Sequence, residues 1–148
     1  MSLHSVTWRI NASAIDNIDL LEDSLKWITG ENSLVEIIKD KSFHGAKQYS
    51  VIAKTQKRKE SIDSLKKIGV ENLSRILEEG IGKRIDESKN LHIRLELNKL
   101  VSGEVCLASK NKTTATAKGK FKIESYPGET AGEVITVLIE SIIKDMKN

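Results

Sequence analysis

The sequence predicts an α+β fold in which a single mixed or antiparallel sheet carries helices on one of its faces. Some stretches alternate apolar and polar residues as strands do, and others repeat apolar residues at helical spacing. The strands also come in runs, which favours hairpin connections over parallel crossovers. The expected order is β-α-β-β-α-α-β-β-β-α. A chain of 148 residues suits one compact unit, so we expect a single domain over residues 1–148.

The first part of the chain predicts three strands and one helix. Residues 4–12 alternate apolar and polar side chains, as an amphipathic strand does. Apolar residues then recur at helical spacing over residues 18–28, and Gly30 is the expected end of that helix. Residues 33–40 and 46–55 indicate two further strands, joined as a hairpin.

The second part predicts two helices, three strands and a last helix. Their expected positions are residues 56–69, 70–80, 91–97, 105–108, 118–123 and 129–146. The clearest strand alternates four apolar residues with polar ones: Leu91, Ile93, Leu95 and Leu97. Gly103 ends this run and the short apolar stretch VCLA follows it as a strand.

Three lysines in the last expected strand point to function. Lys118, Lys120 and Lys122 are two positions apart, so their side chains share one face of a strand. Phe121 and Ile123 then face the core. A row of like charges repels itself, so it needs solvent or a polyanion beside it.

Composition excludes several classes of protein. Hydrophobic residues make up 39% of the chain and charged residues 30%, which is within the globular range. There is no apolar run long enough to span a bilayer and nothing that resembles a signal peptide, so we expect no membrane partner. The single cysteine, Cys106, excludes an internal disulfide and fits a reducing compartment. We therefore expect a cytoplasmic protein.

Positive charge is concentrated in two windows. Residues 45–59 and residues 105–123 each hold five lysine or arginine residues and no acid, on a chain whose net charge is only +3. Such segregation indicates an anionic partner. The alternative is two solvated lysine-rich surfaces, since runs of charge are commonly just that.

The chain shows no motif for catalysis, metal binding or a cofactor. His4, His44 and His92 are scattered, and no cysteine or carboxylate stands at metal-ligand spacing from them. The glycines of residues 80–82 follow a helix rather than a strand, so they are not a dinucleotide fingerprint. We therefore expect no enzyme, no metal and no cofactor.

The few aromatic residues bear on the kind of nucleic acid. Trp8, Tyr49 and Phe121 fall on the core side of their strands, and Phe43 is the ring expected to be free for stacking. Recognition through lysines fits reading of the backbone or shape of structured RNA better than stacking on single-stranded bases. The charge pattern alone suits DNA as well as RNA.

Three segments together resemble a family of archaeal RNA-binding proteins described as predicted exosome subunits. They are SFHGAKQYSVIAKTQKRKESIDSL, RIDESKNLHIRLELNKLVSGEVCLA and the basic KFKIESYP. The most specific parts are His44-Gly45, the basic start of the second helix and the stretch from Arg84 to Lys99. The family pattern near the end of that stretch is Asp-Lys, whereas this chain has Asn98-Lys99. The resemblance implies a fold similar to the fifth large-subunit ribosomal protein, a cytoplasmic setting and RNA binding.

On that basis we expect RNA phosphates to be bound by both windows. The expected contacts are Lys47, Lys54, Lys57, Arg58, Lys59, Lys110, Lys112, Lys118, Lys120 and Lys122, with His44, Arg94 and Lys99 as further candidates at sugar or base edges. The protein would be a non-catalytic RNA binder, an accessory of an RNA-processing or exosome-type assembly. The alternative is a protein-interaction module that docks an acidic partner without direct RNA contact. The RNA partner, the oligomeric state and the meeting of the two windows on one surface stay open at this point.

Overall fold

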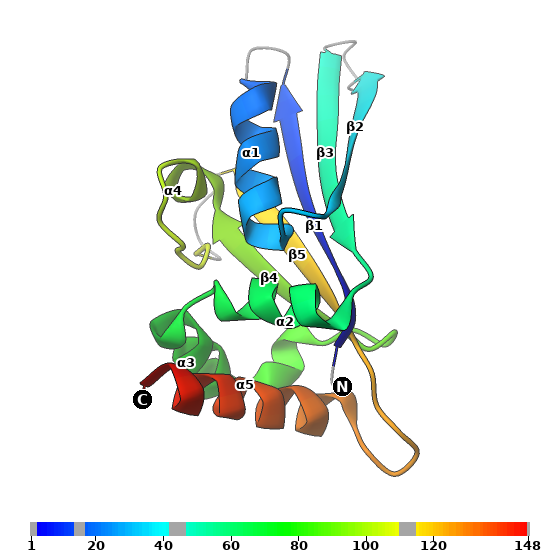
Figure 1. Cartoon of the computed structure of the whole chain (residues 1–148), viewed down its shortest axis with the longest axis vertical. Helices are drawn as coiled ribbons and strands as arrows, with labels where there is room; N and C mark the ends of the chain where they lie inside the picture. The colour runs from blue at the N-terminus through cyan, green and yellow to red at the C-terminus, as the bar shows by residue number, and fades with distance from the viewer. Residues whose placement is uncertain (1–2, 14–16, 42–46, 110–114, 148) are drawn as a thin grey trace.

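A five-stranded antiparallel sheet runs the length of the molecule, in the order β2-β3-β1-β5-β4 (Figure 1). The computed structural model describes residues 3–13, 17–41, 47–109 and 115–147, without the side chains of residues 13, 40, 41 and 47. The strands are β1 (Leu3–Ser13), β2 (Leu34–Lys41), β3 (Lys47–Thr55), β4 (Asn90–Glu96) and β5 (Thr116–Ile123). The predicted α+β class with one antiparallel sheet is confirmed.

The described helices cover one face and one end of this sheet. Helix α1 packs on β1 and β3, and α2 packs on β1, while α3 and α5 pack against each other near the end where the described chain starts (Figure 1). The helices are α1 (Ile18–Thr29), α2 (Arg58–Lys66), α3 (Val70–Glu79), the 3-10 turn η1 (Ile81–Arg84), α4 (Leu97–Val101) and α5 (Ala131–Lys147). No helix in the described residues is both long and apolar enough to cross a membrane.

The core lies between the sheet and its helices. Trp8 on β1 and Phe121 on β5 are fully buried, and their rings meet edge to face with centroids 5.8 Å apart. The indole Nε1 of Trp8 donates a hydrogen bond to Ser64 Oγ on α2 at 2.9 Å. This bond satisfies a buried polar group and fixes α2 over the middle of the sheet.

The predicted alternation of faces is confirmed in β1, β4 and β5. Leu91, Ile93, Leu95, Phe121 and Ile123 are all buried, as expected. The polar positions between them therefore point to the opposite face of the sheet. The helix predicted to end at Gly30 does so, and the positive φ of +136° there suits glycine.

One predicted strand is wrong. Residues 105–108 form a single isolated bridge, Leu95 with Leu107, rather than a strand. The chain leaves β4 after Glu96 and forms α4, in which Leu97 and Leu100 are both buried. Leu97 is thus a core residue through helical spacing and not through strand alternation. The described residues between 86 and 123 hold two strands, β4 and β5, where three were expected.

Candidate nucleic-acid interface

The face of the sheet opposite the helices carries a row of three cations. Lys118 on β5 stands opposite Arg9 on β1 and opposite Arg94 on β4. Directly opposed side chains on neighbouring strands have Cβ atoms about 4.5–5.5 Å apart. Three like charges therefore lie side by side across the sheet.

Further lysines lie in the rows next to this one. Thr7 on β1 is opposite both Lys54 on β3 and Lys120 on β5, while Lys122 lies one row further along β5. The register thus places six basic residues at positions of the same face, here termed the open-face cations: Arg9, Lys54, Arg94, Lys118, Lys120 and Lys122. Lys122 is half-buried and the other five are exposed.

No open-face cation has a carboxylate partner among the described residues. None of the six forms an ion pair with any residue of the described segments. Arg9 instead donates to Ser50 Oγ at 3.3 Å, and Lys122 donates to the backbone oxygen of Ser88. Their mutual repulsion is therefore not offset by a direct ion pair within this part of the chain.

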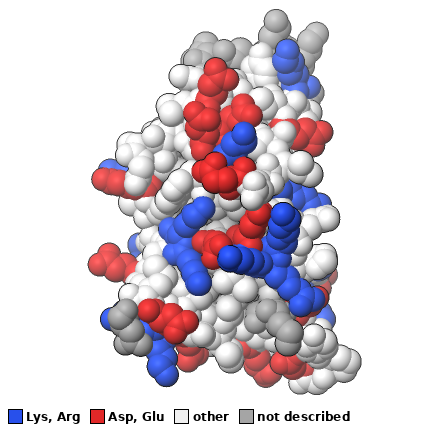
Figure 2. Space-filling view, viewed as in Figure 1, with Lys and Arg blue, Asp and Glu red and all other residues white. Residues whose placement is uncertain are grey.

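The first basic window divides between the two sides of the sheet. Lys54 is on the open face, whereas Lys57, Arg58 and Lys59 lie at the start of α2, which packs against the opposite face. Arg58 is also engaged, because its Nη2 is 3.1 Å from Oε1 of Glu124. Figure 2 shows that the helix-covered side has acidic side chains gathered over α1 and both signs of charge intermingled over α2.

Other predicted contacts lie apart from the open face or outside the described residues. Lys99 is on α4, which contacts α1, and its Nζ is 3.7 Å from Glu104 Oε2. His44, Lys110 and Lys112 lie outside the described residues, as does the side chain of Lys47.

Arg9 and His92 are not among the contacts expected from the sequence. Both alternate outward on their strands, which is visible in the sequence. Their importance comes from their neighbours: Arg9 is opposite Lys118, and His92 is opposite Lys120. Alternation identifies the face of a strand but not the strand beside it, so only the register reveals these neighbours.

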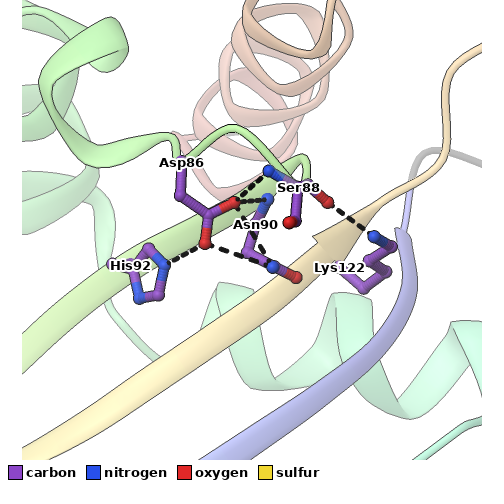
Figure 3. A network of polar contacts seen from close by, with 5 residues as sticks. All are labelled: Asp86, Ser88, Asn90, His92 and Lys122. Atoms are coloured by element: carbon purple, nitrogen blue, oxygen red, sulfur yellow. Dashed lines mark hydrogen bonds and ion pairs between the residues drawn. The ribbon is translucent and has the colours of Figure 1, made fainter.

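Asp86 organises the edge of this face beside β4 (Figure 3). Its carboxylate accepts hydrogen bonds from the backbone N–H groups of Ser88 and Asn90, both at 2.9 Å, and from the Asn90 side chain. His92 Nε2 lies 2.7 Å from Asp86 Oδ2. The hydrogen bond from His92, followed by that from the Asn90 backbone, holds the pKa of Asp86 well below its usual range. The ionised Asp86 therefore requires that Nε2 of His92 carry the proton, which fixes the orientation of the ring.

A cavity of about 640 Å³ opens next to this turn. It is bounded by the end of α3, by η1, by the outward side of β4 and β5, and by residues 108 and 109 beside β4. Five basic side chains line it: Lys83, Arg84, His92, Arg94 and Lys118. Two of these, Arg94 and Lys118, are also open-face cations, so the cavity is continuous with the cationic row.

The two carboxylates of the cavity are held by hydrogen bonds. Glu79 accepts from Arg84 at 3.2 Å and from Arg75 at 3.4 Å, and the Arg84 hydrogen bond lowers the pKa of Glu79. Asp86 is engaged by His92 and Asn90. Both groups are therefore ionised at neutral pH, and neither suits the role of a general acid. No group of three or more metal-ligating side chains occurs among the described residues.

Two aromatic rings other than Phe43, the ring expected to be free for stacking, are exposed. Phe43 lies outside the described residues, and Trp8 and Phe121 are buried as predicted. Trp27 on α1, however, is 45% exposed and lies under the ammonium group of Lys67, while Tyr126 is 57% exposed. Neither ring belongs to a strand of the sheet, so the described strands of the open face present no exposed ring.

The fold and this site define an α+β protein with one helix-covered sheet face and one face that carries the open-face cations. No family model matches the sequence, and no curated protein matches it. Solved structures do match in fold. Mth689, a DUF54 protein from Methanothermobacter thermautotrophicus, has a TM-score of 0.75 at 18% identity, over 97% of this chain and 99% of its own.

Two further archaeal proteins described as DUF54 share the fold. Protein AF2318 from Archaeglobus fulgidus has a TM-score of 0.70 at 20% identity, over 98% of this chain and 97% of its own. Protein SSO0741 from Sulfolobus solfataricus has a TM-score of 0.64 at 17% identity, over 93% and 98%. The chain therefore has the fold of archaeal DUF54 proteins.

Proposed function

We propose that this protein is a non-catalytic RNA-binding protein that contacts the phosphate backbone of structured RNA through its open sheet face. The observation that carries the proposal is the cationic row, in which Arg9, Lys118 and Arg94 stand side by side with no ion-paired carboxylate among the described residues. Such a row costs free energy in the isolated protein, and a polyanion laid across it removes that cost. The six open-face cations then act as one basic patch.

The shape of the patch favours backbone contacts over base stacking. The cations lie on a sheet surface without exposed rings in the described strands, so they can meet phosphates but offer nothing for unstacked bases. Double-stranded RNA is bound mostly through its shape, its phosphates and its 2′-hydroxyls. The resemblance of the sequence to archaeal RNA-binding proteins supports RNA over DNA as the polyanion.

The same resemblance supports a wider role. We infer that the protein serves in the cytoplasm as an accessory of an RNA-processing or exosome-type assembly. We also propose that the fold is similar to that of the fifth large-subunit ribosomal protein, as the sequence resemblance implies.

The test is a salt titration of binding to duplex RNA, single-stranded RNA and duplex DNA. If about five cations neutralise phosphates, the logarithm of the association constant should fall with the logarithm of salt concentration at a slope of roughly −3.5 to −4.5. Duplex RNA should bind tightest. The RNA proposal is overturned if none of the three nucleic acids binds at low salt.

Single substitutions separate the open face from the other predicted contacts. Lys54→Gln and Lys120→Gln should each weaken RNA binding and reduce the salt slope by about 1. Lys99→Gln, on α4 and paired with Glu104, is the matched control and should leave both quantities unchanged. A different pair of results would support the protein-interaction module instead. The native protein would have negligible affinity for RNA, and charge reversal at Lys118, Lys120 and Lys122 would abolish binding of an acidic protein partner.

A further inference from the structure

The cavity beside β4 has an excess of positive charge that its own acids do not neutralise. Two carboxylates, Glu79 and Asp86, face four lysine and arginine side chains as well as His92. Glu79 is matched by Arg84, and Asp86 by His92. The remaining three basic side chains, Lys83, Arg94 and Lys118, form no ion pair with any described residue.

These three side chains come from different elements and converge on the same space. Arg94 and Lys118 are opposed on β4 and β5, and Lys83 reaches the cavity from η1. The Arg94 guanidinium can bind two oxygens of one phosphate at once, while Lys83 and Lys118 supply point charges. The hydrogen bond to Asp86 holds the His92 ring at the wall of the same cavity.

The excess charge matches a phosphate monoester better than a phosphodiester. A monoester carries about −1.5 to −2 at pH 7 and has three free oxygens, whereas a backbone diester carries a single negative charge. The cavity has two more positive than negative side chains even when His92 is neutral. A dianion therefore balances the cavity, and a diester leaves it positive.

The size of the cavity indicates more than a lone phosphate. Its volume of about 640 Å³ lies within the usual range for sites that enclose a small molecule. That space accommodates a phosphate together with the nucleoside that carries it. Because Arg94 and Lys118 belong both to the cavity and to the cationic row, a chain lying on the open face can end in the cavity.

We propose that this cavity binds the phosphate monoester of a nucleotide, through Lys83, Arg94 and Lys118. If the ligand belongs to RNA, an inference that rests on the proposed function, it is the phosphorylated end of a strand. A free nucleotide carries the same phosphate group. The site therefore distinguishes phosphorylated from hydroxyl RNA ends.

The experiment compares one RNA sequence with three kinds of end: 5′-phosphate, 3′-phosphate and hydroxyl at both ends. Fluorescence anisotropy measures each affinity, and adenosine 5′-monophosphate and adenosine are titrated separately by calorimetry. One phosphorylated RNA should bind about tenfold tighter than the hydroxyl RNA, the gain expected for one or two charge-assisted hydrogen bonds. Adenosine 5′-monophosphate should compete for this gain, and adenosine should not.

Two variants divide the cavity from the rest of the open face. Lys83 is on η1 and is not an open-face cation, so Lys83→Gln should abolish the preference for the phosphorylated end and leave hydroxyl RNA binding unchanged. Lys54 is on the open face and does not line the cavity, so Lys54→Gln should weaken all the RNAs equally and keep the preference. Thermal unfolding of both variants checks that they fold.

The outcomes separate this inference from the proposed function. Equal affinity for phosphorylated and hydroxyl RNA, with no binding of adenosine 5′-monophosphate, overturns the cavity site while leaving RNA binding intact. Binding of adenosine 5′-monophosphate that Lys83→Gln removes, without affinity for any RNA, supports the cavity site and overturns the proposed function. A preference that survives in Lys83→Gln also overturns the assignment to this cavity.

Discussion

The indole ring of Trp8 lies directly against Gly119, so that a Cβ atom on residue 119 would stand only 2.6 Å from Cη2 of that ring. The two residues are opposed in β1 and β5. Gly119 separates Lys118 from Lys120 and contributes no side chain to the core. The absence of a side chain leaves space for the largest buried ring of the protein while both lysines point outward.

Gly119→Ala should therefore destabilise the protein. The added methyl group forces the fully buried Trp8 ring or its strand to move, at a cost of about 1–3 kcal/mol in the free energy of unfolding. Urea denaturation followed by tryptophan fluorescence measures it. Gly132→Ala is the control, because a Cβ there meets nothing nearer than 3.9 Å and alanine suits helix α5 better than glycine. Equal stability of the Gly119 variant and the native protein would contradict the close contact.

The hydrogen bond between Trp8 and Ser64 gives a second prediction. Ser64→Ala leaves the indole N–H buried without a partner, which should lower the free energy of unfolding by about 1–3 kcal/mol. Ser102→Ala is the control, since Ser102 is exposed and a change there should stay within about 0.5 kcal/mol. Equal effects of the two substitutions would show that the indole finds another partner.

Asp86 gives a prediction about pH. The pKa of Asp86 is lowered in the folded protein, so its ionised form contributes to the free energy of unfolding. This contribution is fully present above the pKa of Asp in the unfolded chain, about 3.9. It is lost as the pH falls through the lower pKa of the folded protein. Asp86→Asn should thus lower the free energy of unfolding at pH 7, by about 1 kcal/mol or less at this solvent-screened site. The difference from the native protein should shrink below about pH 4.

Chemical denaturation at several pH values measures this difference. Glu87→Gln removes an exposed carboxylate of the same turn that accepts no hydrogen bond from the described residues, so it controls for the loss of charge alone. Native and Asp86→Asn curves that stay parallel from pH 7 to pH 2 would show that the hydrogen bonds of Asp86 do not favour its ionised form.

The sequence predicts which face each strand residue occupies, but not which residues are neighbours across strands. Alternation was sufficient to place Phe121 in the core and the three lysines of β5 on the opposite face, because side chains of a strand have a period of two. The row formed by Arg9, Lys118 and Arg94 depends on pairing between distant segments. That pairing is selected by the packing of the whole sheet, and no local pattern encodes it.

The region between β4 and β5 shows a second limit. Leu95 and Leu97 continue the alternation of β4, yet the chain turns into α4 at Leu97. Over so few residues, apolar spacing fits both a strand and a short helix, so tertiary packing decides between them. The cavity depends on this change from strand to helix, because the chain that follows α4 brings residues 108 and 109 to the cavity wall. The sequence could therefore predict cations on one strand face but not the cavity that encloses two of them.

The cationic row predicts that one substitution increases stability while reducing binding. Lys118→Gln removes the middle charge of the row, so the repulsion by Arg9 and Arg94 disappears. The free energy of unfolding should rise by about 0.2–1 kcal/mol at low salt. The gain should fade near 1 M salt, where the screening length is about 3 Å. RNA affinity should decrease in the same variant if the proposed function holds.

Denaturation at low and high salt, together with RNA binding by fluorescence anisotropy, measures both effects on the same preparation. Lys144→Gln is the control, because Lys144 lies in the last turn of α5, where a positive charge interacts favourably with the helix dipole. That control should lose a little stability and leave RNA binding unchanged. A Lys118→Gln variant that is less stable than the native protein at low salt would contradict this prediction. It would show that repulsion among the three charges does not destabilise the protein, and the main reason to expect a polyanion on this face would be lost.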